Sequence, residues 1–89
     1  MIKAIFTHPV ADYAKWRAVF DASQHLTKQA GGRNATVCTS VDNPNLVSVH
    51  ADWDSVEKVN AFASNPQLME AMQKSGVLEK PTLTIWEVK

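Results

Sequence analysis

The stretch 46–53 has the most regular alternation of apolar and polar residues in the chain. Its apolar positions are Val47, Val49, Ala51 and Trp53, and its polar positions are Ser48, His50 and Asp52. Successive side chains of a β-strand point to opposite faces of a sheet. The pattern therefore predicts a strand with one face buried in a core, Trp53 included, and a second face that bears a histidine.

Three more stretches, 2–7, 34–41 and 82–88, have the composition of strands. The first is apolar on both faces, as is typical of a central strand, and it ends before Pro9. The second alternates in the same way as 46–53. The third follows Pro81 and is apolar on both faces. Together these stretches predict a sheet of four strands.

The strands at 34–41 and 46–53 are expected to form a hairpin, because the segment Asp42–Asn45 between them consists of turn-forming residues. A slip of one residue would send polar side chains to the core, so the register is restricted. In the register that we predict, Cys38 lies opposite His50. One face of this hairpin is then uniformly polar or small.

The first helix is predicted from the apolar residues that recur at three- and four-residue spacing after Asp12. The Asp12 carboxylate is a suitable N-cap, because it can accept hydrogen bonds from free amides of the first turn. We expect the helix to run to Ala30. Gly31 and Gly32 follow, and glycine readily adopts the left-handed conformation that ends a helix.

The second helical segment is expected to begin at a capping box formed by Asp54 and Glu57 and to end at Gly76. Asn65 and Pro66 interrupt it. Proline is favoured at the first position of a helix, so we expect Asn65 to cap a new helix that begins with Pro66.

The order strand, helix, strand, strand, helix, strand predicts one α+β domain over residues 1–89, with a ferredoxin-like βαββαβ fold. Both helical segments then cover one face of a four-stranded antiparallel sheet. The opposite face has no cover from its own chain and carries polar and apolar side chains. Mixed exposed faces of this size are typically interfaces or ligand sites. We therefore expect a symmetric homodimer that packs sheet against sheet.

Composition restricts the possible partners of this 89-residue chain. Its formal net charge is zero, which argues against binding to nucleic acid or to an anionic membrane surface. One cysteine excludes an internal disulfide and fits a reducing cytoplasm, so a cytoplasmic location is expected. The N-terminus lacks the pattern of a signal peptide, and no stretch approaches 18 apolar residues.

The chain resembles the dimeric α+β barrel superfamily, and within it the small proteins similar to antibiotic biosynthesis monooxygenases and cyclases. The resemblance rests on Ala11–Trp16, Ser40–Asn45 and Phe62–Leu68, with Met72 and Gly76–Val77. It implies a homodimer whose two sheets form a barrel, with a ligand cavity between each sheet and its helices or loops. Members include cofactor-free monooxygenases of polycyclic phenols, haem-degrading enzymes, isomerases and proteins without known activity. No catalytic motif of a characterised branch can be transferred residue by residue.

His50 is the strongest candidate for chemistry, because a histidine on a polar strand face can act as a general base near neutral pH. The predicted ligand pocket consists of Cys38, Ser48, His50, Trp86 and His8. A hydrogen-bonded structural histidine in a dimer interface or a cavity wall is the competing interpretation of His50. No metal site is expected, since the histidines lack ligand spacing, and no cofactor is expected.

Two functions are compatible with these residues. The first is a cofactor-independent monooxygenase or cyclase that acts on, or binds, a small apolar or aromatic molecule. The alternative is a non-catalytic dimeric module for ligand binding or assembly. An enclosed cavity of ~300 Å³ or more with His50 pointing into it would favour the enzyme. A hydrogen bond from His50 to the partner subunit would favour the module.

Overall fold

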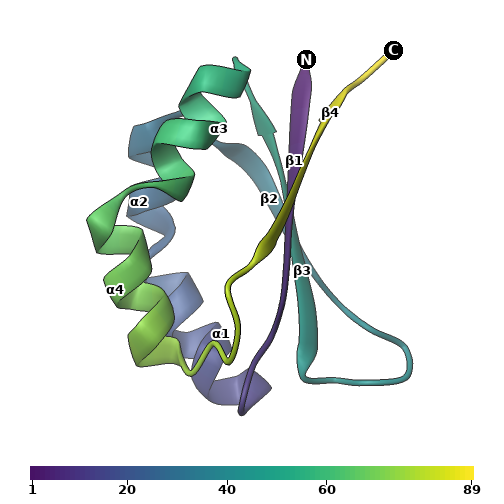
Figure 1. Cartoon of the computed structure of the whole chain (residues 1–89), viewed down its shortest axis with the longest axis vertical. Helices are drawn as coiled ribbons and strands as arrows, with labels where there is room; N and C mark the ends of the chain where they lie inside the picture. The colour runs from purple at the N-terminus through teal and green to yellow at the C-terminus, as the bar shows by residue number, and fades with distance from the viewer.

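The computed structural model describes residues 1–89. In chain order the elements are β1 (Ile2–Pro9), α1 (Tyr13–Ala22), α2 (Gln24–Ala30), β2 (Arg33–Thr39), β3 (Leu46–Trp53), α3 (Val56–Ala63), α4 (Pro66–Ser75) and β4 (Thr82–Glu87). The strands form one antiparallel sheet in the order β2-β3-β1-β4, and all helices lie on one side of it (Figure 1). The predicted ferredoxin-like α+β fold is confirmed. None of the four helices has the length and apolar character that crossing a membrane requires.

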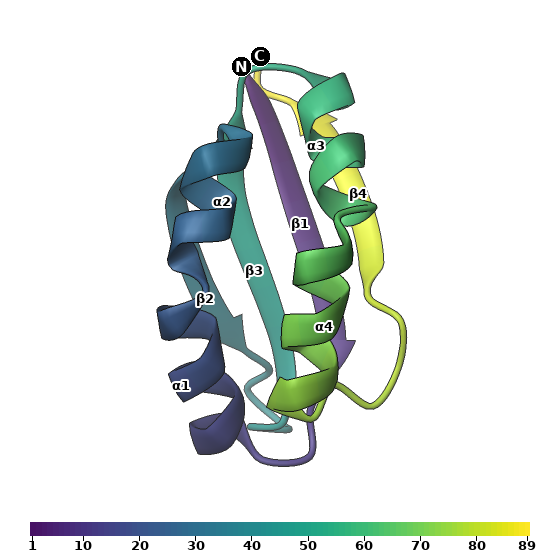
Figure 2. The same cartoon turned by 90° about the vertical axis from the view of Figure 1, so that its left-hand side faces the viewer.

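The first predicted helix is divided in two at Ser23, which the sequence pattern did not predict. Trp16 of α1 packs with Val10 and Val47 at one end of the sheet. Leu26 of α2 belongs to the core cluster at the other end. Figure 2 shows α1 and α2 following one another along the same side of the sheet, so each segment covers a different end of it.

The interruption of the second helical segment is confirmed at the residues predicted. Asn65 caps α4 through its side-chain oxygen, which accepts from the Gln67 amide at 2.9 Å. Pro66 occupies the first turn of α4, where its missing amide proton removes no helical hydrogen bond.

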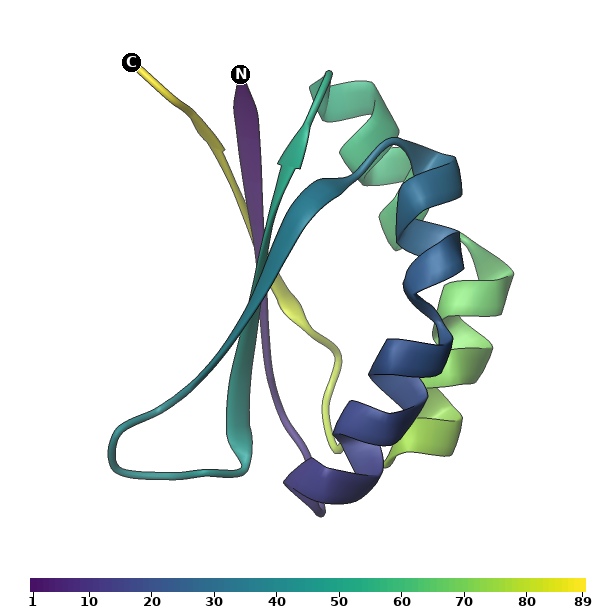
Figure 3. The ribbon, with the colours of Figure 1, turned by 180° about the vertical axis from the view of Figure 1, so that it is seen from behind.

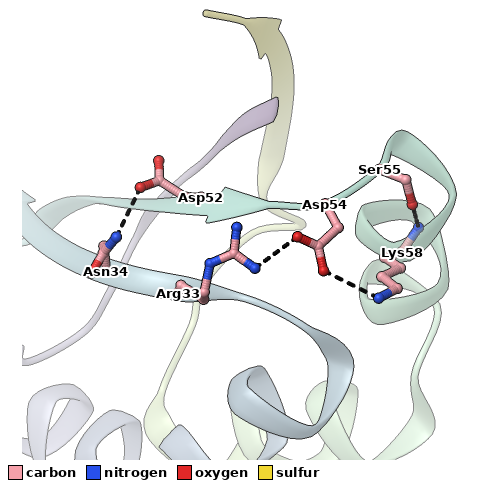
Figure 4. A network of polar contacts seen from close by, with 6 residues as sticks. All are labelled: Arg33, Asn34, Asp52, Asp54, Ser55 and Lys58. Atoms are coloured by element: carbon pink, nitrogen blue, oxygen red, sulfur yellow. Dashed lines mark hydrogen bonds and ion pairs between the residues drawn. The ribbon is translucent and has the colours of Figure 1, made fainter. Parts of the chain in front are cut away.

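The capping box predicted at Asp54 is wrong by one residue. Ser55 is the N-cap of α3, and its hydroxyl oxygen accepts from the Lys58 amide at 3.3 Å. The Asp54 carboxylate instead binds the Arg33 guanidinium at 2.7 Å and the Lys58 ammonium at 3.3 Å (Figure 4). These contacts, that with Arg33 foremost, lower the pKa of Asp54. Asp54 therefore joins the start of β2 to the start of α3.

The hairpin forms as predicted, but its register differs by two residues. His50 lies opposite Thr36, and Cys38 lies opposite Ser48. The reason is the connection: the Ser40 amide donates to the Leu46 carbonyl at 2.9 Å, which makes the loop longer than the tight turn expected. An even-numbered shift keeps every side chain on its predicted face.

The core lies between the sheet and the helices and consists of two clusters. The larger has Ala4, Leu26, Ala51, Trp53, Val59 and Phe62, and the smaller has Val10, Trp16 and Val47. Trp53 is 1% exposed and packs against the Phe62 ring of α3, as predicted. Gly32 approaches the same indole so closely that an added Cβ would lie 2.9 Å from Trp53 Cζ2. Both clusters include side chains of β3 that point toward the helices, and Ala4 of β1 belongs to the larger one.

The other face of the sheet has no helix against it (Figure 3). We call it the open face. Strand alternation and pairing place on it Lys3, Ile5, Thr7, Thr36, Cys38, Ser48, His50, Asp52, Thr84 and Trp86. Trp86 is 58% exposed there. The β2–β3 connection projects from the sheet on this side (Figure 3).

Truncation of Trp53 to alanine is expected to lower the free energy of unfolding by about 3–5 kcal/mol, because it removes a buried aromatic ring from the larger cluster. Val41→Ala is the control. Val41 is fully exposed in the β2–β3 connection, so its loss should cost less than about 0.5 kcal/mol. Urea denaturation measures both. Similar midpoints for the two variants would contradict the assignment of Trp53 to the core.

Candidate functional site

A cavity of about 80 Å³, partly open to solvent, lies between the sheet and the helical layer. Side chains from both layers line it: Phe6, His8, Trp16, Phe20, Ser23, Gln24, Thr27, Ala35, Val49, Ala51, Trp53, Phe62, Leu68, Met72 and Pro81. We call it the inner cavity. Most of this lining is hydrophobic, and His8 is its only titratable residue. A polar group here meets a mostly apolar environment.

His8 reaches the inner cavity because it occupies one of the positions of β1 whose side chains point toward the helices. Ala4 and Phe6 also face the helices, and His8 is the next inward position along the strand. Its side chain is 5% exposed and lies edge-on to the Trp16 ring, with 5.7 Å between ring centroids. Nδ1 of His8 is buried and has no hydrogen-bond partner. Buried polar atoms are normally hydrogen-bonded, so this nitrogen indicates a position for a ligand or water atom.

The indole of Trp53 presents a second atom of this kind. Nε1 of Trp53 is buried without a hydrogen-bond partner, and Trp53 also lines the inner cavity. Within this structure, His8 Nδ1 and Trp53 Nε1 are the two buried side-chain polar atoms that lack a partner. Both therefore belong to residues around one space.

Burial lowers the pKa of His8, and a backbone contact with Pro9 opposes this shift in part. The cause is desolvation, which disfavours the charged imidazolium in a mostly apolar cavity. His8 is consequently neutral at pH 7. A neutral imidazole carries one protonated and one free nitrogen, so it can accept a hydrogen bond from a hydroxyl group.

A second, wider depression opens to solvent beside the inner cavity. This outer groove has a volume of about 840 Å³ and is bounded by α4, the segment 77–81 and β4. Phe6, Leu68, Met72 and Pro81 line both the outer groove and the inner cavity. The two spaces therefore adjoin at these four residues, and a molecule bound in the outer groove lies next to the inner cavity.

The structure divides the predicted pocket between two faces of the sheet. Cys38, Ser48 and His50 are neighbours on the open face, and Trp86 lies on the same face but on the opposite edge strand. His8 lies on the helix-covered face. On the open face, His50 Nε2 is 3.0 Å from the Ser48 hydroxyl oxygen. His50 therefore does not point into the inner cavity, and its catalytic role stays a prediction.

Sequence reasoning missed the cavity role of Trp53, because burial alone explained an inward tryptophan. The signal that could have revealed it is the indole N–H, which needs a partner when buried. Phe20 and Met72 also line the inner cavity, whereas their spacing in the sequence indicates only the apolar face of a helix. No group of three or more His, Cys, Asp and Glu side chains could hold a metal ion.

No protein-family model and no curated protein matches this sequence. Solved structures do match it. A candidate antibiotic biosynthesis monooxygenase from Bordetella bronchiseptica has a TM-score of 0.84 at 18% identity, over 99% of this chain and 96% of that one. SnoaB, a cofactor-independent oxygenase from Streptomyces nogalater, has a TM-score of 0.78 at 12% identity, over 99% and 92%.

A third similar structure is the monooxygenase from the gene ActVA-Orf6 of Streptomyces coelicolor, in complex with the ligand nanaomycin D. Its TM-score is 0.69 at 19% identity, over 99% of this chain and 87% of that one. At these identities the likeness defines the fold. The fold is that of the antibiotic biosynthesis monooxygenase-like proteins, as the resemblance implied.

Protonation of His8 is expected to destabilise the fold. Because its pKa is lower in the folded protein than the ordinary 6.5, the unfolded chain binds more protons below that pH. The free energy of unfolding should be fully retained above about pH 6.5 and should fall as the pH drops toward the lowered pKa.

Denaturant titrations over about pH 5 to 8 measure this dependence. His8→Gln should flatten the profile, whereas His25→Gln, at an exposed position of α2, should leave it unchanged. A His8→Gln profile parallel to that of the parent protein would show that His8 does not cause the acid destabilisation.

Proposed function

We propose that this chain, which has the fold of the antibiotic biosynthesis monooxygenase-like proteins, binds a small aromatic molecule and acts on it without a cofactor. The ligand would carry a hydroxyl group and a carbonyl group. One observation carries the proposal: the unpartnered atoms His8 Nδ1 and Trp53 Nε1 belong to residues that line one mostly apolar cavity. Sites for small molecules commonly combine an apolar lining with a few polar groups.

The two atoms specify complementary ligand groups. The indole N–H of Trp53 can only donate, so it requires an acceptor such as a carbonyl oxygen. His8 Nδ1, with the ring proton on Nε2, accepts a hydrogen bond from a hydroxyl. Apolar side chains around them would contact the faces of an aromatic ring.

The size of the inner cavity limits what part of the ligand it holds. Its volume of about 80 Å³ lies below the ~300 Å³ at which pockets for drug-sized molecules begin. The ligand would place one polar edge in the inner cavity and its remainder in the outer groove. This arrangement favours a flat molecule over a bulky one.

The chemistry that this arrangement supports is withdrawal of a proton from the ligand hydroxyl. His8 is neutral and can receive the proton, and the resulting anion beside it would stabilise the imidazolium. Trp53 would donate to the carbonyl oxygen, where negative charge spreads. An electron-rich enolate of this kind can react with dioxygen, and SnoaB is described as a cofactor-independent oxygenase. The part of the protein is to supply a base and a pocket that excludes water.

We further infer a homodimer that packs through the open face. Trp86 is 58% exposed there, opposite Lys3 and diagonal to Ile5. An exposed tryptophan near an isoleucine is apolar surface that a second subunit would cover. The β2–β3 connection projects from the same side, where it would extend along a facing sheet (Figure 3). In such a dimer His50 would lie in the interface rather than in the cavity.

Hydroxytetralone, a small aromatic ketone with a phenolic hydroxyl, is a suitable probe for the cavity. His8→Phe should weaken its binding about tenfold, which corresponds to one lost hydrogen bond of ~1.4 kcal/mol. Methoxytetralone, which cannot donate, should bind the parent and the variant with similar affinity. Calorimetric titration measures these affinities, and oxygen consumption by the parent shows whether binding leads to turnover.

His50→Ala is the matched control for this titration. It removes a histidine from the open face and should leave hydroxytetralone affinity unchanged. Loss of binding in His50→Ala with retention in His8→Phe would overturn the assignment and restore His50 as the site histidine. Binding without oxygen consumption by any of several quinols would favour the non-catalytic module.

A dimer through the open face predicts a mass in solution of about twice the 9.8 kDa of one chain. Trp86→Lys should dissociate it, because a charge would be buried in the interface. Met69→Lys places the same charge on the exposed side of α4 and should leave the dimer intact. Light scattering measures both, and a monomeric parent protein at micromolar concentration would contradict the inference.

A further inference from the structure

The junction between the inner cavity and the outer groove is formed by Phe6, Leu68, Met72 and Pro81, because these four residues line both spaces. We call this set the neck. Its members come from β1, from α4 and from the segment that precedes β4. Any molecule that passes from the outer groove to His8 must move between these side chains.

One wall of the neck is held by packing. The Phe6 ring lies edge-on to Phe62, with 6.1 Å between centroids and an interplanar angle of 84°. Phe62 in turn is buried in the larger core cluster against Trp53. Phe6 therefore packs against a firm neighbour, which itself lines the inner cavity.

Leu68 and Met72 form the facing wall on α4. They are four residues apart on one helix, so their side chains are neighbours on the same face. Both are half-buried. Methionine is unbranched and has several rotatable bonds, so it can change shape at low cost while the helix backbone stays in place.

Pro81 belongs to the part of the neck that has the fewest backbone hydrogen bonds. The segment before it is attached where the Val77 amide donates to the Met72 carbonyl at 3.3 Å and the Leu78 amide donates to the Pro9 carbonyl at 3.1 Å. Residues 79–81 make no backbone hydrogen bond. Figure 2 shows this segment looping out beside α4 before it enters β4. Segments with few hydrogen bonds open at low free-energy cost.

We propose that Met72 is a gate and a specificity-determining residue, which together with the adjacent Pro81 segment sets the size of molecule that reaches His8 and Trp53. The inference rests on the proposed function for the identity of the ligand. The passage itself can be tested without a ligand, because Trp16 and Trp53 both line the inner cavity and are intrinsic fluorophores.

The first test uses acrylamide quenching in a Trp86→Phe background, which leaves only the two tryptophans of the inner cavity. Met72→Ala should raise the quenching constant several-fold, because it removes the flexible side chain from the neck. Met69→Ala is the matched control: Met69 lies three residues earlier on α4, is 50% exposed and lines the outer groove alone. It should leave quenching unchanged.

Met72→Phe protects the test against a simple loss of stability. A larger, stiffer side chain should lower quenching below that of the parent protein, an effect that partial unfolding cannot produce. Quenching that is equal in parent, Met72→Ala and Met72→Phe, with melting curves showing that all three are folded, would overturn the proposal.

The second test measures the association rate of hydroxytetralone, which should rise several-fold in Met72→Ala and fall in Met72→Phe. If the quenching constants respond to Met72 but hydroxytetralone does not bind, the gate stands and the proposed function fails. If hydroxytetralone binding depends on His8 while quenching and association ignore Met72, the proposed function stands and the gate fails.

Discussion

Aromatic side chains hold the helical layer above the sheet, and every feature of the site depends on that separation. At one end Trp16 of α1 stacks on Phe20 of the same helix at 4.9 Å and packs with Val47 of β3. At the other end Trp53 of β3 lies 5.2 Å from Phe62 of α3. Between them the sheet presents Ala51, whose short side chain lines the inner cavity. The inner cavity therefore lies where large rings and a small side chain meet between the two layers.

Much of the fold could be predicted from the sequence because it depends on local chemistry. Strand alternation gives the buried face directly, and Asn65 with Pro66 has one favourable arrangement at a helix start. The two predicted details that are wrong, the hairpin register and the cap at Asp54, depend on residues that are distant in the sequence. The hairpin register follows the length of the connection that Ser40 closes, and Asp54 leaves its predicted cap because Arg33 arrives from another strand. Neither partner is visible in a local pattern.

The site was predictable in part, for a related reason. The alternation of side chains along β3 correctly predicted that His50 lies on the face without helices. The same alternation along β1 places His8 on the inner face, which the helices cover. What the sequence could not indicate is which face holds a cavity. That depends on how far the helices stand from the sheet, and this distance follows from the packing of aromatic rings contributed by three separate elements, α1, β3 and α3. Candidate residues can therefore be named from a sequence before their environments can be assigned.

The close approach of Gly32 to Trp53 has a consequence for the entropy of binding. The indole is confined on one side by the Gly32 backbone, where a Cβ would lie 2.9 Å from Cζ2, and Phe62 packs against the same ring. It cannot turn freely, so the direction of its N–H bond is determined when the chain folds. A ligand that accepts from this group does not have to immobilise it, and the cost of orienting the donor is borne by folding rather than by association.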